Sequence, residues 1–219
     1  MSGPARFWLT CVFFAATFLL GTTLFAEKIR NHFDADTMGR PPGFFDLVVL
    51  GVPSPARWLI LSDPNPPSAP NRLAQVEKNR PADSIAAAIR RNYAFADGTV
   101  SAFIRQGPGR AGLLLRVAAE KDFLALLVDT ASGDAVLSSY RGGKPTELGR
   151  GHATLARNWE KLSVTASGPR VSVFLDDQKL FDATDPMPLS GRTGLATAGP
   201  GEASFDEFVL EFEPGDGKR

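Results

Sequence analysis

The last third of the chain alternates apolar and polar residues, and this alternation limits the fold more than any other feature. After Trp159 the pattern covers residues 162–166, 171–177 and 204–212. A period of two places successive side chains on opposite faces of a strand, whereas a helix repeats its apolar residues every three or four positions. This part of the chain is therefore predicted to form short, half-buried strands.

Composition points to one domain and excludes one class of partner. A length of 219 residues lies in the range of roughly 200–250 residues that undivided β-sandwiches reach. The 24 basic and 24 acidic residues balance, so the chain lacks the basic field that attracts nucleic acid, which we exclude as a partner. Cys11 is the only cysteine, so neither a disulfide framework nor a cysteine metal site is expected.

The N-terminus has the layout of a secretory signal. Arg6 precedes an uncharged, mostly apolar segment at residues 7–26, which we expect to be helical and cut after Ala26. Leu24 stands where a small residue is preferred, and about 20 apolar residues suffice to span a bilayer, so an uncleaved membrane anchor is the alternative for residues 1–26. We expect an exported protein, periplasmic or extracellular, that contacts a membrane only through residues 7–26.

The rest of the chain is predicted to form strands and turns. Apolar runs separated by Gly, Pro, Asn or Asp recur about every 8–12 residues, as in sandwiches. A helix competes at residues 84–91 because of their alanines, but a strand is preferred because Ile85, Ala87 and Ile89 alternate. The predicted fold is an all-β, two-sheet antiparallel jelly-roll sandwich at residues 27–213, with a polar tail at 214–219.

Six short segments, in this order along the chain, carry a resemblance to a known family: residues 33–34, 111–116, 159–164, 173–177, 191–197 and 205–208. Over about residues 33–213 the chain resembles concanavalin A-like, laminin-G-like jelly rolls, and it is most similar to the bacterial 3-keto-disaccharide hydrolase-like domain. Proteins of this shape include sugar-binding modules, glycoside hydrolases and enzymes proposed to act on 3-keto-glucosides. The resemblance therefore implies the fold and leaves the activity open.

No clear catalytic constellation is visible. Glycoside hydrolysis usually needs two carboxylates, and the run Glu-x-Asp-x-x-Glu of comparable hydrolases is missing. Glu207 and Glu211 are interpreted as a solvated face of the final strand. His32 and His152 are too far apart in the chain to indicate a metal site, and no Gly-x-Ser-x-Gly motif is present.

Arg116 is the strongest ligand-binding candidate. Leu113, Leu115 and Val117 are expected on one face of a strand, with Leu114 and Arg116 on the other. A guanidinium among apolar neighbours is unusual, and its fork suits hydroxyl pairs or a carboxylate. The resemblance implies an arginine that faces the concave sheet. The alternative is an arginine on a strand edge or solvated face that is paired with an acid.

Two further pairs of residues complete the candidate sites. Trp58 and Trp159 are the bulkiest options for stacking on a sugar, although each is also a natural core residue. In many jelly rolls a calcium ion ties the first and last strands, and the resemblance places Asp34 and Asp206 where such ligands would lie. The alternative is that Asp206 caps a turn, and no other cofactor is expected.

The sequence thus predicts an exported jelly-roll domain that binds carbohydrate or another surface polymer. One alternative is a hydrolase of 3-keto-glycosides or other glycosides, because a keto group permits elimination-like cleavage without the usual carboxylate pair. Another alternative is a structural or partner-binding laminin-G-like module. Whether the protein is an enzyme stays open.

Overall fold

Every regular element in the described part of the chain is a β-strand. The computed structural model describes residues 27–105 and 107–212. Within these ranges no helix is long and apolar enough to cross a membrane. In chain order the strands of these ranges are β1 (Glu27–Asn31), β2 (Phe45–Gly51), β3 (Trp58–Ser62), β4 (Asn71–Gln75), β5 (Ser84–Phe95), β6 (Gly98–Arg105), β7 (Arg110–Ala119), β8 (Asp122–Asp129), β9 (Asp134–Arg141), β10 (Lys144–His152), β11 (Trp159–Ser167), β12 (Arg170–Leu175), β13 (Gln178–Thr184), β14 (Gly191–Ala198) and β15 (Ala203–Phe212).

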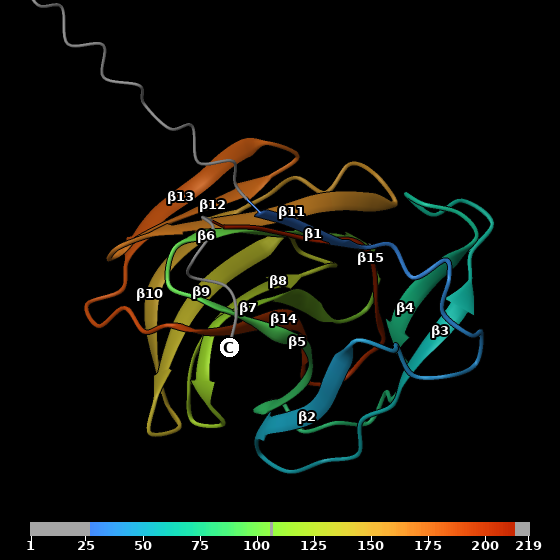
Figure 1. Cartoon of the computed structure of the whole chain (residues 1–219), viewed down its shortest axis with the longest axis horizontal. Helices are drawn as coiled ribbons and strands as arrows, with labels where there is room; N and C mark the ends of the chain where they lie inside the picture. The colour runs from blue at the N-terminus through green and yellow to red at the C-terminus, as the bar shows by residue number, and fades with distance from the viewer. Residues whose placement is uncertain (1–26, 106, 213–219) are drawn as a thin grey trace, which may run out of the picture.

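The strands form two antiparallel sheets that pack face to face (Figure 1). The eight-stranded sheet has the order β13-β12-β11-β6-β15-β4-β3, and β1 pairs with β15 beside this path. The seven-stranded sheet has the order β10-β9-β8-β7-β14-β5-β2. The predicted two-sheet sandwich is confirmed, and the first described strand pairs with the last, Glu27 opposite Phe212.

The main core lies between the sheets. Along each strand, every second side chain points inward and belongs to this core, as the alternation in the sequence predicted. In β11, Leu162, Val164 and Ala166 point into this core, and Ser163 and Thr165 point away from it. Aromatic contacts strengthen the packing, including Phe45 against Phe208 at 5.5 Å between ring centroids.

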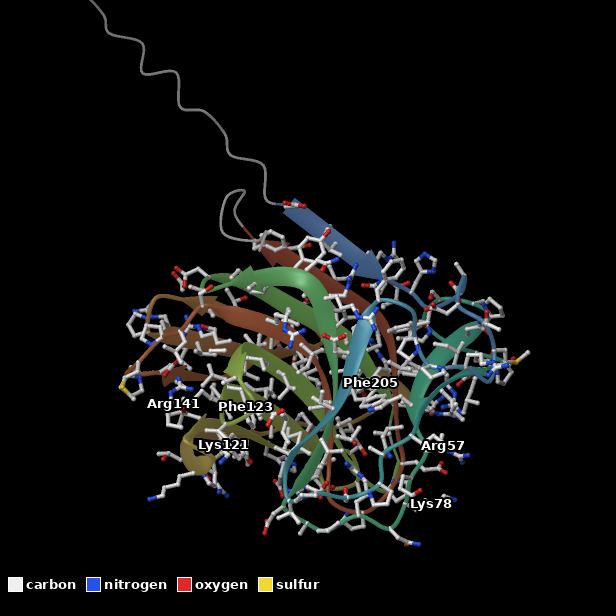
Figure 2. All side chains as sticks on the ribbon, turned by 60° about the horizontal axis from the view of Figure 1, so that its bottom comes forward. Arg57, Lys78, Lys121, Phe123, Arg141 and Phe205 are labelled. Atoms are coloured by element: carbon white, nitrogen blue, oxygen red, sulfur yellow. The ribbon has the colours of Figure 1, made fainter. Side chains whose placement is uncertain are left out.

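A second apolar cluster covers the outer face of the seven-stranded sheet. Small side chains dominate its middle, with Ala87, Ala125 and Ala196 all buried beside Leu114. Phe123 stacks on Tyr140 at 4.4 Å between ring centroids. Figure 2 shows Phe123, Lys121 and Arg141 near one another, and Arg57 and Lys78 on the opposite side of the molecule. Burial raises the pKa of the Tyr140 hydroxyl.

The strand prediction at residues 84–91 is confirmed, since β5 covers that segment and continues to Phe95. The sequence analysis did not single out three strands at sheet edges, β1, β10 and β13. β10 is mostly exposed and contains Pro145, Glu147 and Arg150, so it lacks the apolar alternation that marks a half-buried strand. The helix, signal or anchor predicted for residues 1–26 and the tail at 214–219 lie outside the described residues.

Gly112 offers a test of the strand packing in the seven-stranded sheet. A Cβ atom on Gly112 would lie 1.8 Å from the backbone carbonyl oxygen of Leu126 in the neighbouring strand. We expect Gly112→Ala to lower the free energy of unfolding by about 2 kcal/mol or more, because the backbone must move to relieve the clash. Gly107→Ala, where a Cβ meets nothing within 4 Å, is the matched control in urea denaturation. Equal stability of the two variants would contradict this packing.

Candidate functional site

Arg116 lies inside the sandwich. The ladder between β7 and β8 shifts register after Leu115, and Arg116 adopts a positive φ of 51°. This bulge inserts a residue and reverses the alternation beyond it. Val117 therefore joins Leu114 on the outer face, which corrects the prediction that Leu114 and Arg116 share a face.

The guanidinium of Arg116 is occupied by acceptors of the protein itself. Nε donates to the carbonyl of Ala96 at 3.0 Å, Nη1 to the Asp185 carboxylate at 2.9 Å, and Nη2 to the carbonyl of Gly168 at 2.6 Å. Arg116 is 2% exposed. The pair with Asp185 agrees with the acid pairing of the alternative, but Arg116 is buried and not on a strand edge or solvated face. A ligand-binding role for Arg116 stays a prediction.

The two tryptophans occupy different environments. Trp58 is buried in the main core against Phe205, at 5.8 Å between ring centroids. Trp159 is 8% exposed and lines a surface cavity of about 510 Å³. Arg116 contacts Gly168, directly after β11, whereas Trp159 begins β11. The three predicted ligand-binding residues therefore do not converge, and Trp159 alone lies at a described cavity.

Asp34 and Asp206 are both held by donors near the loop between β3 and β4. Asp206 accepts hydrogen bonds from the backbone and hydroxyl of Ser68 and from the backbone of Glu207. Asp34 accepts from the backbone N–H of Asn71 at 3.1 Å. The described residues contain no group of three or more His, Cys, Asp or Glu side chains that could hold a metal. Hydrogen-bond donors already contact both carboxylates and stabilise their charge without a cation. The calcium site therefore stays a prediction.

Asp206 is nevertheless unusual, because burial raises its pKa to about 7. Its three hydrogen-bond donors favour the charged form, but the loss of solvent outweighs them. The carboxyl group therefore titrates near neutral pH.

The outer face of the eight-stranded sheet presents a different surface. Along β6 and β11 four residue pairs lie side by side on this face: Thr99 with Thr165, Ser101 with Ser163, Phe103 with Lys161, and Arg105 with Trp159. The hydroxyls of Thr99 and Thr165 hydrogen-bond at 2.9 Å, and the Arg105 guanidinium lies 6.0 Å from the centroid of the Trp159 ring. One half of the face is thus rich in small hydroxyl side chains and the other half in large side chains.

Three cavities follow these two strands, and we call them together the outer-face groove. The first, about 510 Å³, contains Trp159, Glu207 and Pro66; the second, about 680 Å³, contains Glu160 and Asp176; the third, about 340 Å³, contains Ser101 and Ser163. The first two cavities share Phe103 and Arg157, and the last two share Lys161 and Asp177. The shared residues place the cavities beside one another, and the second cavity also reaches Ala153 and Leu175 of the main core, at the end of the sandwich.

Polar side chains at the centre of the groove are fixed by the turn between β12 and β13. Asp176 and Asp177 both have positive φ, 46° and 63°, as in a two-residue type I′ hairpin turn. Asp176 accepts from the backbone of Lys161 at 2.8 Å and from the Arg157 guanidinium at 3.0 Å, and Asp177 pairs with the Lys161 ammonium at 3.0 Å. The turn therefore places two ion pairs on one wall of the groove.

Glu160 lies beneath this wall. Its Oε1 accepts hydrogen bonds from the backbone N–H groups of Ala156 and Arg157, each at 2.7 Å. Burial raises the pKa of Glu160, and hydrogen bonding with the Asp176 carboxyl raises it further. Glu160 thus holds the loop between β10 and β11 against the sheet.

Of the residues that line the groove, the sequence analysis singled out Trp159 and did not consider Phe103, Lys161 or Asp177. Thr99, Ser101, Phe103 and Arg105 are the outward positions of one alternating strand, so their direction was readable. Their pairing with β11 could not be predicted, because the register between two strands about 60 residues apart in the chain depends on the whole fold.

The comparisons with known proteins concern the fold. Neither a protein-family model nor a curated protein matches this chain. The carbohydrate-binding module CBM66 from Bacillus subtilis is similar with a TM-score of 0.58 and 18% identity, over 77% of this chain and 96% of that one. The exoplasmic/lumenal domain of VIP36, in a form bound to Ca²⁺ and Man3GlcNAc, has a TM-score of 0.52 and 18% identity, over 78% and 85%.

A protein of unknown function with a galectin-like fold, also from Bacillus subtilis, has a TM-score of 0.53 and 11% identity, over 80% of this chain and 90% of that one. At such identities the similarities establish architecture alone. The chain is a two-sheet antiparallel jelly-roll sandwich, an architecture that also occurs in the CBM66 module.

The buried ion pair between Arg116 and Asp185 predicts how replacing Arg116 changes the stability of the protein. Arg116→Met should lower the free energy of unfolding by about 3 kcal/mol, because it leaves a buried Asp185 carboxylate without its closest cation. Arg150→Met, which removes an exposed pair with Glu147, should leave urea denaturation unchanged. Unchanged stability of Arg116→Met together with lost ligand binding would instead favour the ligand-binding role.

The raised pKa of Asp206 predicts how the free energy of unfolding depends on pH. The unfolded state loses this proton near pH 4 and the folded state near pH 7, so the free energy of unfolding should fall as pH rises between these values and level off above. We expect a fall of about 2 kcal/mol, less than the full difference in pKa would give, because solvent screens part of it. Asp206→Asn should remove this contribution when denaturation is followed across pH 4–8. The idea fails if the variant and the natural protein keep the same pH dependence.

Proposed function

We propose that this protein is an exported carbohydrate-binding domain and that the outer-face groove is its binding site. One observation carries the proposal: Phe103 and Trp159 share a cavity with the charged side chains of Arg30, Arg157 and Glu207. Aromatic faces pack against the apolar face of a sugar ring, and surrounding polar groups bind its hydroxyls. The jelly-roll architecture shared with CBM66 supports the same assignment.

The groove offers both donors and acceptors for hydroxyl groups. Lys161 and Arg157 supply N–H donors, and Asp177 supplies carboxylate oxygens on the same wall. Asp177 and Arg157 are both exposed. A sugar would replace water around these groups while Phe103, which is half-buried, packs against its ring.

A glycoside hydrolase, including one for 3-keto-glycosides, is the alternative. Asp176, the carboxylate that lines the same cavity as Glu160, is occupied by the Arg157 guanidinium and the backbone N–H of Lys161, so it is not free to act as the second carboxylate of a hydrolase. Glu160 is also held by two backbone amides. This geometry favours binding over hydrolysis, and we expect no turnover of glycosides or 3-keto-glycosides.

Export rests on the sequence of residues 1–26. Arg6 and the apolar segment at residues 7–26 favour a signal that is cut after Ala26, with a retained membrane anchor as the alternative. The mass of the protein recovered from cells tests this part of the proposal. A soluble form that begins at Glu27 would support cleavage, and a full-length form in the membrane fraction would support the anchor.

Phe103→Ala is the direct test of the groove. We expect it to weaken carbohydrate binding about tenfold or more, which corresponds to about 1.4 kcal/mol, while the free energy of unfolding changes little because the ring lies on the outer face. Calorimetric titration with neutral and charged glycans measures the effect.

Phe44→Ala is the matched control, since Phe44 is 58% exposed and lies beside β2 in the other sheet. Equal binding by both variants would exclude the groove. Binding of no glycan by the natural protein would favour the partner-binding alternative.

A further inference from the structure

The outer-face groove is long enough for more than one sugar. β6 has eight residues, which span about 25 Å in an extended strand. The groove follows this strand from the cavity at Trp159 to the cavity at Thr99 and Thr165. A fourth cavity of about 410 Å³ shares Thr99 and Glu211 with it and continues to Gly98 and Ser167, at the ends of β6 and β11.

Side-chain size creates this shape. In the half of the groove away from Phe103, the floor consists of the short side chains of Thr99, Ser101, Ser163 and Thr165 on the two central strands. Larger side chains stand on the flanking strands, with Phe174 on β12 and Val209 on β15. Short residues between taller ones make a trough that runs parallel to the strands and is lined by hydroxyls.

The lining carries no excess charge. The three cavities of the groove contain five cations and five carboxylates beside His152: Lys28, Arg30, Arg157, Lys161 and Lys179, with Glu160, Asp176, Asp177, Glu207 and Glu211. Four of the cations pair with four of these carboxylates, and Lys179 pairs with Asp182. A charged glycan would have to break such pairs to bind, whereas a neutral glycan would not.

We propose that the outer-face groove binds a linear, uncharged polysaccharide, with several consecutive sugar units lying along β6 and β11. This rests on the proposed function and adds the ligand class. The Phe103 and Trp159 half packs against one sugar ring, and the hydroxyl floor hydrogen-bonds the units that follow. The affinity should therefore grow with chain length.

The test uses two series of probes with the purified protein. Neutral oligosaccharides from cellulose, xylan and mannan, from the monosaccharide to the hexasaccharide, are titrated beside oligogalacturonates of the same lengths. We expect at least one neutral series to gain about tenfold or more in affinity from the disaccharide to the hexasaccharide. Oligogalacturonates should bind more weakly.

Thr165→Tyr tests whether the hydroxyl floor causes the gain in affinity with chain length. The Thr165 side chain points outward, so a tyrosine at this position would fill the floor. The substitution should remove the gain in affinity with chain length. Ser138→Tyr, on β9 in the other sheet, is the matched control and should keep the gain.

The outcomes separate this inference from the proposed function. Neutral sugars that bind with no dependence on length, or a gain that Thr165→Tyr leaves intact, would overturn the inference and retain carbohydrate binding. Tighter binding of oligogalacturonates than of neutral oligosaccharides would overturn the proposal that the ligand is uncharged. Absence of binding to every probe, with Phe103→Ala indistinguishable from the natural protein, would overturn both.

Discussion

The buried ion pair between Arg116 and Asp185 is the interaction on which the arrangement of the two sheets depends. Arg116 belongs to the seven-stranded sheet, and its acceptors belong to three other connections of the chain. Ala96 lies between β5 and β6 and Asp185 between β13 and β14, where the chain passes from one sheet to the other. Asp185 also accepts from Arg141 on β9. Desolvating these charges is costly, and complete pairing offsets the cost, so the cluster specifies how this end of the sandwich closes.

Sequence patterns predicted most strands because the direction of a side chain on a strand is a local property. The runs at 162–166 and 204–212 and the contested segment at 84–91 all became strands. The site was harder to predict for a physical reason. Bulges at Arg116 and Glu207, both with positive φ, insert residues that reverse the alternation. Glu207 is consequently almost buried and paired with Arg30, and it does not belong to a solvated face.

The two outer faces of the sandwich differ in chemistry although they share one fold. Alanines, leucines and isoleucines fill much of the outer face of the seven-stranded sheet. Threonines, serines and ion pairs line the opposite face. Because a sugar ring needs hydrogen-bonding partners as well as an aromatic surface, the eight-stranded sheet is the better match for a glycan. Of the three predicted ligand-binding residues, Trp159 lies on this face, whereas Trp58 and Arg116 are buried in the interior, and the ligand-binding roles of all three stay predictions.

The first described strand contributes one wall of the outer-face groove. Lys28 and Arg30 stand on β1, which is joined to the sandwich by its ladder with β15. The neighbouring part of the same flank of β15 is taken by β4. β1 is therefore an edge strand, and its removal would uncover Val209 and Glu211 and would also remove Ile29, which packs against the main core. The width of the groove therefore depends on five residues, Glu27–Asn31, and both a chain that begins at Glu27 and the full-length chain contain all of them.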